Sequence, residues 1–147
     1  FAHIIGNMWF LYIFGDNVES ILGHVKYFIF YLACGVGSAL AQFIIESTSQ
    51  VPMIGASGAI AGVLGAYMIR FPKARVYVLA VLFIFITTFD VTAQTVLGLW
   101  FLMQLTGGLG SLGMDTTGGV AWFAHIGGFI IGVTSLKYFQ NFRIEKV

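Results

Sequence analysis

Two polar residues in strongly apolar surroundings have the chemistry of a nucleophile and a base. Ser57 lies in the run Gly55-Ala56-Ser57-Gly58, within a stretch that carries no charge from Val51 to Ile69. His125 lies in a second such run, Ala124-His125-Ile126-Gly127-Gly128. A serine hydroxyl becomes an effective nucleophile when an adjacent base accepts its proton, and a neutral imidazole can do so at physiological pH. The two residues are a candidate catalytic dyad, because catalytic partners need only be close in space.

Another polar cluster lies near the start of the chain. His3 and Asn7 are four residues apart and therefore share one face of a helix. Polar side chains in membrane helices usually face a protein interior or a water-filled cavity. These two could join helices by hydrogen bonds or donate to an oxyanion, and the residues alone leave both roles open.

Composition indicates a membrane protein. Of the 147 residues, 59% are hydrophobic and 9% are charged, whereas a soluble domain has roughly 25% charged residues. The length predicts a single domain over residues 1–147. A net charge of +1 provides no field that would attract nucleic acid. The lone Cys34 cannot form an internal disulfide and is expected to be a packing residue, and no metal or cofactor is predicted.

The apolar blocks have the lengths of membrane helices, which need about 20 residues to cross a bilayer. We predict an all-α, polytopic membrane helical bundle with five such helices, at about residues 3–22, 27–45, 56–69, 91–105 and 120–138. The apolar stretch 76–89 is too short to cross alone and is expected to lie at the interface or to re-enter the membrane. Residues 107–119 are predicted to form a glycine-rich loop around Asp115. The alternative, a soluble all-α core, is disfavoured by the near absence of charge.

Basic residues follow three of the predicted helices and fall on one side of the membrane if each helix crosses once. They are Lys26, Arg70, Lys73, Arg75, Lys137, Arg143 and Lys146. Positive charge collects on the cytoplasmic side of membrane proteins. The helix ends that carry Ser57 and His125 are therefore expected to open to the outside, on the side of Glu46 and Asp115. This predicts a prokaryotic plasma-membrane protein with an extracytoplasmic site.

The glycine-rich runs also have a purely structural explanation, since small residues let membrane helices pack closely. The small residues concerned are Gly55, Gly58 and Gly62 in the first run and Gly128 and Gly132 in the second. A lone histidine in an apolar helix is likewise more often a hydrogen-bonded structural group. Two small-residue faces, each with one polar group, would nevertheless let the imidazole of His125 reach the hydroxyl of Ser57.

Four motifs occur in sequence along the chain. They are His3-x-x-x-Asn7, the segment Phe14-Gly15-Asp16-Asn17-Val18-Glu19 through Leu22-Gly23, Gly55-Ala56-Ser57-Gly58 with Gly62, and Ala124-His125-Ile126-Gly127-Gly128. In this order they resemble the motifs of the rhomboid family of intramembrane serine proteases, and the resemblance covers essentially the whole chain. The family has a core of six membrane helices. The resemblance therefore implies that the first helix is absent and that the chain is truncated at its N-terminus.

The resemblance also implies a role for each matching residue. Ser57 resembles the nucleophile and His125 the general base, in a dyad without a carboxylate. His3, Asn7 and the backbone N–H of Ser57 resemble the oxyanion hole. Some relatives have an aromatic residue four positions after the serine, beneath the histidine ring, but this chain has Ala61 there. An aromatic side chain from elsewhere in the chain could take its place beside His125.

The implied function is that of a serine endopeptidase that cleaves in or near the transmembrane segments of membrane-protein substrates. Its partners would be transmembrane proteins and the lipid bilayer, and the oligomeric state stays open. One alternative is a catalytically silent rhomboid-like protein that binds or escorts transmembrane clients, because fold does not determine function. Another is a small transporter or channel lined by Gln42, Gln94 and Gln104, although these are more simply interhelical hydrogen bonders.

Overall fold

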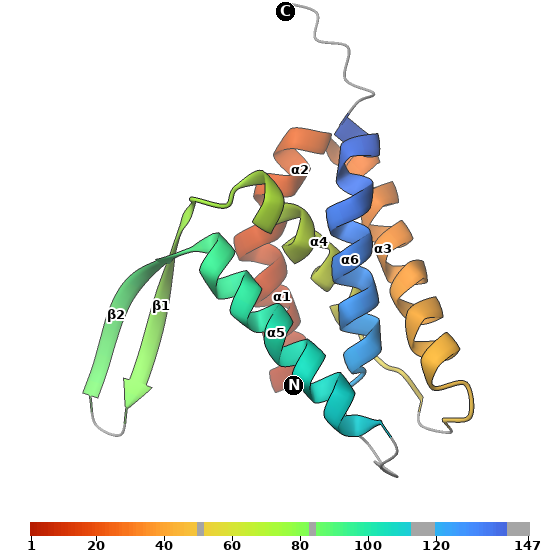
Figure 1. The fold of residues 1–147 in the computed structure, drawn as a ribbon. Coiled ribbons are helices and arrows are strands. Elements are labelled where there is room, and N and C mark those ends of the chain that lie inside the picture. The colour runs from red at the N-terminus through yellow and green to blue at the C-terminus, as the bar shows by residue number, and fades with distance from the viewer. Residues whose placement is uncertain (50–51, 83–84, 113–119, 141–147) are drawn as a thin grey trace, which may run out of the picture.

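Helices make up most of the computed structural model, which describes residues 1–49, 52–82, 85–112 and 120–140. The helices are α1 (Ala2–Phe10), α2 (Asp16–Leu22), α3 (His24–Ile45), α4 (Ser57–Arg70), α5 (Ala93–Ser111) and α6 (Trp122–Gln140), and a π-helical turn, η1 (Leu11–Gly15), joins α1 to α2 (Figure 1). The helical bundle predicted from the sequence is confirmed. The predicted helices agree with the observed ones to within a few residues at most ends.

Local sequence explains where several helices begin and end. Gly23 ends α2 with a φ of 77°, a conformation that favours glycine, and its N–H donates to the carbonyl of Glu19 at 2.7 Å. A second glycine with positive φ, Gly55 at 121°, lies just before α4. At the start of α5, the side chain of Thr92 accepts a hydrogen bond from the N–H of Thr95 at 3.3 Å, which is a typical N-cap.

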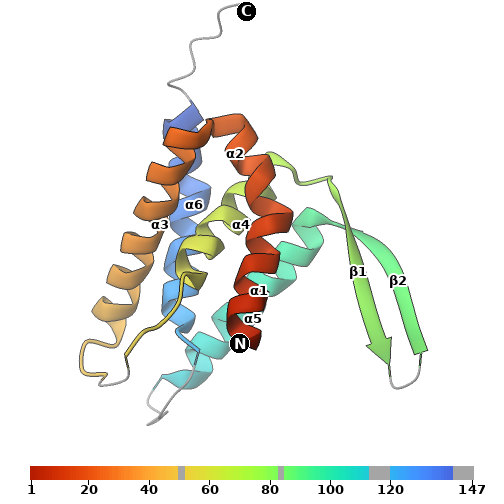
Figure 2. The same cartoon turned by 180° about the vertical axis from the view of Figure 1, so that it is seen from behind.

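The central helix of the bundle is α4. It packs against α6, α3, α5 and η1, and the two opposite views show it between the N-terminal helix and α6 (Figures 1 and 2). All residues of α4 from Gly58 to Tyr67 are buried. The largest fully buried side chains come from α4 itself and from four helices around it: Val18, Phe30, Cys34, Val63, Leu64, Leu97 and Leu136. The site is therefore built on the best-packed helix of the chain.

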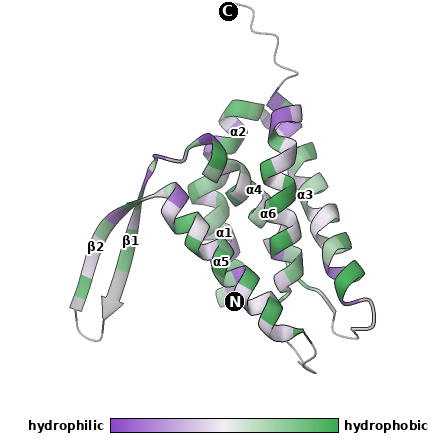
Figure 3. Ribbon diagram, in the orientation of Figure 1, coloured by the Kyte–Doolittle hydropathy of each residue, from purple (hydrophilic) through white to green (hydrophobic). Residues whose placement is uncertain are grey.

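Hydrophobic residues occur along the whole length of the bundle (Figure 3), and many of them are exposed. Large hydrophobic side chains are exposed on several helices, among them Ile4, Trp9, Phe28, Ile44, Leu99 and Ile130. Soluble monomers rarely expose apolar patches of such extent, whereas lipid-facing surfaces do. In the described part of the chain, α3 is the one helix whose length and composition alone would let it cross a membrane.

Basic residues gather at one end of the bundle. Three of the described ones lie at or just after the end of α4, one lies in the first turn of α3 and one in the last turn of α6: Arg70, Lys73, Arg75, Lys26 and Lys137. These elements meet at the upper end in Figure 1, which is called the basic end below. Glu46 follows α3 at the opposite end. The charge asymmetry seen in the sequence thus follows the long axis of the bundle. The other charged residues used in that prediction, Asp115, Arg143 and Lys146, lie outside the described residues.

The apolar stretch after α4 forms a β-hairpin, which was not predicted from the sequence. Strand β1 (Arg75–Leu82) pairs antiparallel with β2 (Phe85–Thr92), so that Val76 faces Val91 and Val78 faces Phe89. Both strands are rich in β-branched and aromatic residues, which favour extended backbone. The hairpin leaves the bundle at the basic end and extends away from α5 (Figure 1).

The expected loop at residues 107–119 begins later than predicted, because α5 continues to Ser111. Glycine at positions 107 and 108 lets α6 pack against α5. A Cβ at Gly107 would lie 2.7 Å from the ring of Trp122, and one at Gly108 would lie 3.3 Å from both Ile126 and Phe123. The prediction of a loop was therefore wrong for residues 107–111, and residues 113–119 are outside the described part.

Candidate active site

The two helices that carry Ser57 and His125 touch backbone to backbone. A Cβ at Gly128 would collide with the carbonyl oxygen of Gly58, and one at Gly132 would collide with that of Gly62. The two contacts are four residues apart on both helices, so they repeat after about one turn. Because a side chain at either position of α6 would separate the helices, these glycines set how closely α4 and α6 approach.

Ser57 and His125 lie beside this crossing. Ser57 is the first residue of α4, and His125 lies in the first turn of α6, about one turn before Gly128. His125 Nε2 and Ser57 Oγ are 2.8 Å apart. The structure thus brings the two residues singled out in the sequence within hydrogen-bond distance, although they are 68 positions apart in the chain.

His3 and Asn7 border the same region from α1. A Cβ added at Gly55, two residues before Ser57, would lie 3.2 Å from His3 Cε1 and 3.8 Å from Asn7 Nδ2. The backbone at Gly55 therefore lies directly against both side chains. Any L-residue at this position would meet the imidazole and would also have to adopt a φ of 121°, which L-residues rarely do.

The beginning of α4 adds backbone donors to this region. Ala56 is the N-cap, and no side chain caps the helix there. The first N–H groups of a helix have no carbonyl partner within it, so those of Ser57 and Gly58 are available to an anion. The helix dipole adds partial positive charge at the same point. An oxygen that gained negative charge beside Ser57 would be stabilised by both effects.

The other ring nitrogen of His125 also has a partner. His125 Nδ1 lies 2.8 Å from Oε1 of Gln104 on α5, and Gln104 is 5% exposed. The ring of Trp100, one turn earlier on α5, lies 5.9 Å from the imidazole at an angle of 38°. Ala61 is fully buried. In this chain the aromatic ring beside His125 therefore comes from α5. The contact of Gln104 with His125 was not predicted, because the sequence indicated only that Gln104 could form a hydrogen bond between helices.

The three glutamines do not line a common path. Gln42 Oε1 accepts a hydrogen bond from the N–H of Ala124 at 2.9 Å, and Gln42 Nε2 donates to Glu46 at 2.7 Å. Gln94 is exposed in the first turn of α5, toward the basic end. Two of the glutamines therefore flank the residues around His125, and the third is remote, which argues against a channel lined by all three.

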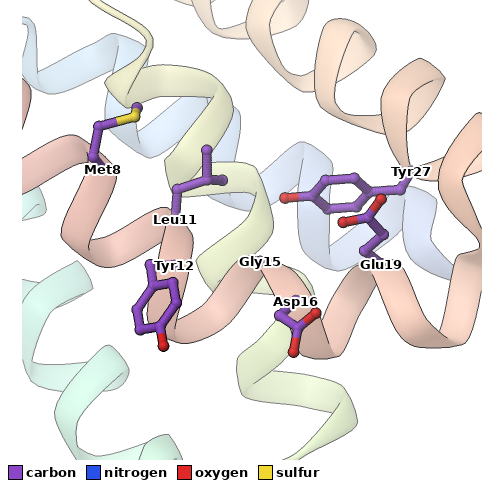
Figure 4. A pocket seen from close by; sticks show the side chains of 7 residues that line it. All are labelled: Met8, Leu11, Tyr12, Gly15, Asp16, Glu19 and Tyr27. Atoms are coloured by element: carbon purple, nitrogen blue, oxygen red, sulfur yellow. The ribbon is translucent and has the colours of Figure 1, made fainter.

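A separate surface cavity of about 510 Å³ lies along α1, η1 and α2. Its lining consists of Met8, Leu11, Tyr12, Gly15, Asp16, Glu19 and Tyr27 (Figure 4). None of the residues predicted for the site is among them. Within the described ranges, no group of three or more His, Cys, Asp or Glu side chains could hold a metal ion.

Proteins with similar sequences include ones from animals, a yeast and a plant. The chain is 31% identical over 144 residues to the human presenilin-associated rhomboid-like protein, mitochondrial. This alignment covers 92% of the chain and 34% of the human protein. It is 28% identical over 151 residues to Rhomboid protein 1, mitochondrial, of Saccharomyces cerevisiae, covering 99% and 40%. It is 33% identical over 133 residues to RHOMBOID-like protein 4 of Arabidopsis thaliana, covering 89% and 29%. No solved structure shows significant similarity to the chain.

These relatives contradict the location predicted from the sequence. The human and yeast proteins are both named as mitochondrial, so the expectation of a prokaryotic plasma membrane was wrong. The physical reason is that a charge asymmetry orders the two ends of a bundle but does not identify the membrane that holds it.

The family of this chain is shown by a family profile that matches nearly its whole length. The chain spans about a third of the length of the curated relatives it matches. The profile of the Rhomboid domain matches residues 1–141. The chain belongs to the rhomboid family.

Proposed function

We propose that this protein is an intramembrane serine endopeptidase that hydrolyses peptide bonds in or near the transmembrane segments of membrane-protein substrates. Membership of the rhomboid family supports this function at the level of the family. The observation that carries it for this chain is the 2.8 Å contact between Ser57 Oγ and His125 Nε2 at the start of a buried helix.

The reaction is an acyl transfer in two steps. Ser57 Oγ attacks the carbonyl carbon of the scissile bond while His125 Nε2 accepts the hydroxyl proton. The imidazolium then returns this proton to the leaving amine as the carbon–nitrogen bond breaks. Water then attacks the acyl-enzyme while His125 accepts its proton. The bond between the acyl carbon and Ser57 Oγ breaks, the second product leaves as a carboxylic acid, and the imidazolium returns the proton to Ser57 Oγ. A hydroxyl–imidazole pair at hydrogen-bond distance is the arrangement that both steps require.

The oxyanion of the tetrahedral intermediate is assigned to the region between α1 and the start of α4. His3, Asn7 and the backbone N–H of Ser57 are the proposed donors. Their support is the proximity of both side chains to Gly55 and the unpaired N–H groups of the first turn of α4. Donors that are fixed in place before the reaction stabilise the developing charge most effectively.

The decisive experiment is covalent labelling with a fluorophosphonate, which reacts with activated serines. We expect the protein in lipid vesicles to be labelled and to cleave a transmembrane substrate, and we expect Ser57→Ala to lose both properties. Ser20→Ala is the matched control, because Ser20 is exposed on α2 and bonds only to its own helix. Equal labelling of wild type and Ser57→Ala would overturn the assignment, and an unlabelled wild type would favour a silent, client-binding rhomboid.

The base is tested by His125→Ala alone and together with Ser57→Ala. Residues that act as one unit are not additive, so the double variant should be no less active than either single variant. A double variant that lost clearly more activity than each single change would show that the two residues act independently.

We further infer that the protein resides in a mitochondrial membrane, because the human and yeast relatives are named as mitochondrial. Fractionation of cells that express the tagged full-length protein measures its location directly. Recovery of the protein in the plasma membrane instead of mitochondria would contradict this inference.

A further inference from the structure

We propose that Gln104 is a positioning residue that holds His125 in the tautomer with the proton on Nδ1. In this tautomer Nε2 carries a lone pair and can accept the proton of Ser57. The inference rests on the proposed function and deepens it, because it names the group that prepares the base for the reaction.

The orientation of the Gln104 carboxamide selects the tautomer. Its Nε2 donates to the carbonyl of Trp100 at 3.5 Å, which leaves Oε1 facing His125 Nδ1 at 2.8 Å. If the amide were turned round, Oε1 would face the carbonyl oxygen of Trp100, and two acceptors would oppose each other. A carboxamide oxygen can only accept, so the nitrogen opposite it has to donate. His125 Nδ1 therefore carries the proton.

The imidazole is restrained from two directions. Gln104 holds Nδ1, and the ring of Trp100 lies beside the imidazole with 5.9 Å between ring centroids. Trp100 is in turn packed against Phe129 of α6, with 6.0 Å between centroids. Both restraints come from successive turns of α5, so this helix fixes the rotamer as well as the tautomer of His125. This arrangement supplies the aromatic support that Ala61 cannot.

A neutral acceptor suits this location better than a carboxylate would. Soluble serine proteases often orient the catalytic histidine with a buried aspartate. At a buried position in apolar surroundings an isolated carboxylate is costly to keep ionised. Gln104 is buried, and its carboxamide orients the ring without introducing a charge. The tautomer is thus selected by hydrogen-bond geometry alone.

The tautomer can be measured without any activity assay. Protein with ¹⁵N-labelled histidine, reconstituted in lipid, reports by NMR which ring nitrogen carries the proton, and the His125 signals are assigned by their loss in His125→Ala. We expect the Nδ1–H form in wild type and a shift toward the Nε2–H form in Gln104→Met, which has similar size and no comparable acceptor. Gln94→Met is the matched control, because Gln94 is exposed on the same helix. An Nε2–H wild type, or an unchanged tautomer in Gln104→Met, overturns the proposal.

Kinetics separate positioning from a merely structural role. We expect kcat of Gln104→Met to fall about 10- to 100-fold, from the loss of one buried hydrogen bond that acts on the base, with KM unchanged. At this buried position the carboxyl group of Gln104→Glu is expected to stay protonated, so that its C=O accepts from His125 Nδ1 while its O–H donates to the carbonyl of Trp100. This variant should therefore restore most of the loss. If Gln104→Glu is no more active than Gln104→Met, or if activity follows only the folded fraction, the proposal fails.

Failure of this inference is distinguishable from failure of the proposed function. If fluorophosphonate labels Ser57 in wild type while Gln104→Met has unchanged kcat and tautomer, Ser57 is still the nucleophile but Gln104 does not position the base. If Ser57 is not labelled in wild type, the proposed function itself is wrong, whatever tautomer His125 adopts.

Discussion

Replacing Gly62 by alanine tests how strictly helix packing controls the site. The added Cβ would lie 2.5 Å from both Cβ and Sγ of Cys34 and 3.1 Å from the carbonyl oxygen of Gly128. Ordinary contacts between carbon atoms are about 3.5–4.0 Å, so α4 would have to move by about 1 Å. Cys34 is fully buried on α3, so its side chain cannot simply turn into solvent.

The expected loss of stability is modest and the expected loss of activity is large. Overpacking a core costs about 1–3 kcal/mol, and replacing glycine by alanine within a helix returns about 1 kcal/mol. The free energy of unfolding should therefore fall by no more than about 2 kcal/mol. If α4 moves by about 1 Å and α6 does not follow, the 2.8 Å contact of Ser57 with His125 lengthens beyond hydrogen-bond distance. Such a misplacement lowers the rate by about 10²-fold.

The assay compares unfolding in a lipid-like environment with the cleavage rate per folded molecule. Gly98→Ala is the matched control, because a Cβ at this position of α5 meets nothing within 4 Å. We expect the control to be slightly more stable than wild type and equally active. A second test combines Gly62→Ala with Cys34→Gly, which removes the atoms that the new Cβ would meet and should restore part of the activity.

Two results would refute this reasoning. The first is a Gly62→Ala protein with wild-type stability and activity, which would mean that the helices are not in limiting contact at this point. The second is a loss of activity that Cys34→Gly does not reduce at all, which would place the cause of the defect elsewhere.

Three further changes test other parts of the structure. Asn7→Ala should lower kcat by about 10²-fold with little change in KM, because an oxyanion donor acts where charge develops; loss of thermal stability with unchanged turnover per folded molecule would instead indicate a structural role. Gly55→Ala should lower the free energy of unfolding by about 1–3 kcal/mol, since residue 55 has a φ of 121°, and calorimetry that shows no change would contradict this. Single cysteines at Thr48 and Lys73, in a Cys34→Ser background, should react with an impermeant thiol reagent from opposite sides of a sealed membrane. If both cysteines react from the same side, the bundle does not span the membrane.

Much of the architecture could be predicted because apolar blocks and their polar interruptions mark membrane helices directly. Ser57 and His125 could be singled out because each is a rare polar residue in a run of small residues. The contact between them depends on backbone approach, and glycines at helical spacing on both helices were a visible signal for it. The order of the motifs then connected these residues to a family.

The partner of His125 could not be identified in this way. The chain has several glutamines in apolar surroundings, and the one that faces the imidazole depends on how α5 is rotated about its axis. In a membrane helix the outer face is as apolar as the inner face, so hydrophobic periodicity does not reveal that rotation. Only the packed structure distinguishes Gln104, which is buried beside the site, from Gln94, which is exposed.

The hairpin was missed for a related reason. Its two strands form one apolar run without the Gly or Asn that usually marks a tight turn, so length alone suggested a short membrane segment. The signal that could have revealed it is composition. Val76, Tyr77 and Val78 begin a run of residues that prefer strands to helices.

The hairpin also constrains the depth at which the protein sits in the bilayer. Both strands have an outer edge whose backbone N–H and C=O groups are not paired within the two-stranded sheet. Such an edge cannot face hydrocarbon, because every unsatisfied group there costs several kcal/mol. The lipid boundary therefore cannot run at the same level around the whole bundle. On the side of the bundle where the hairpin lies, the lipid boundary has to lie farther from the basic end than the hairpin does. The alternative is that another polypeptide covers the two strand edges. In either case the surroundings of the protein differ from one side of the bundle to the other.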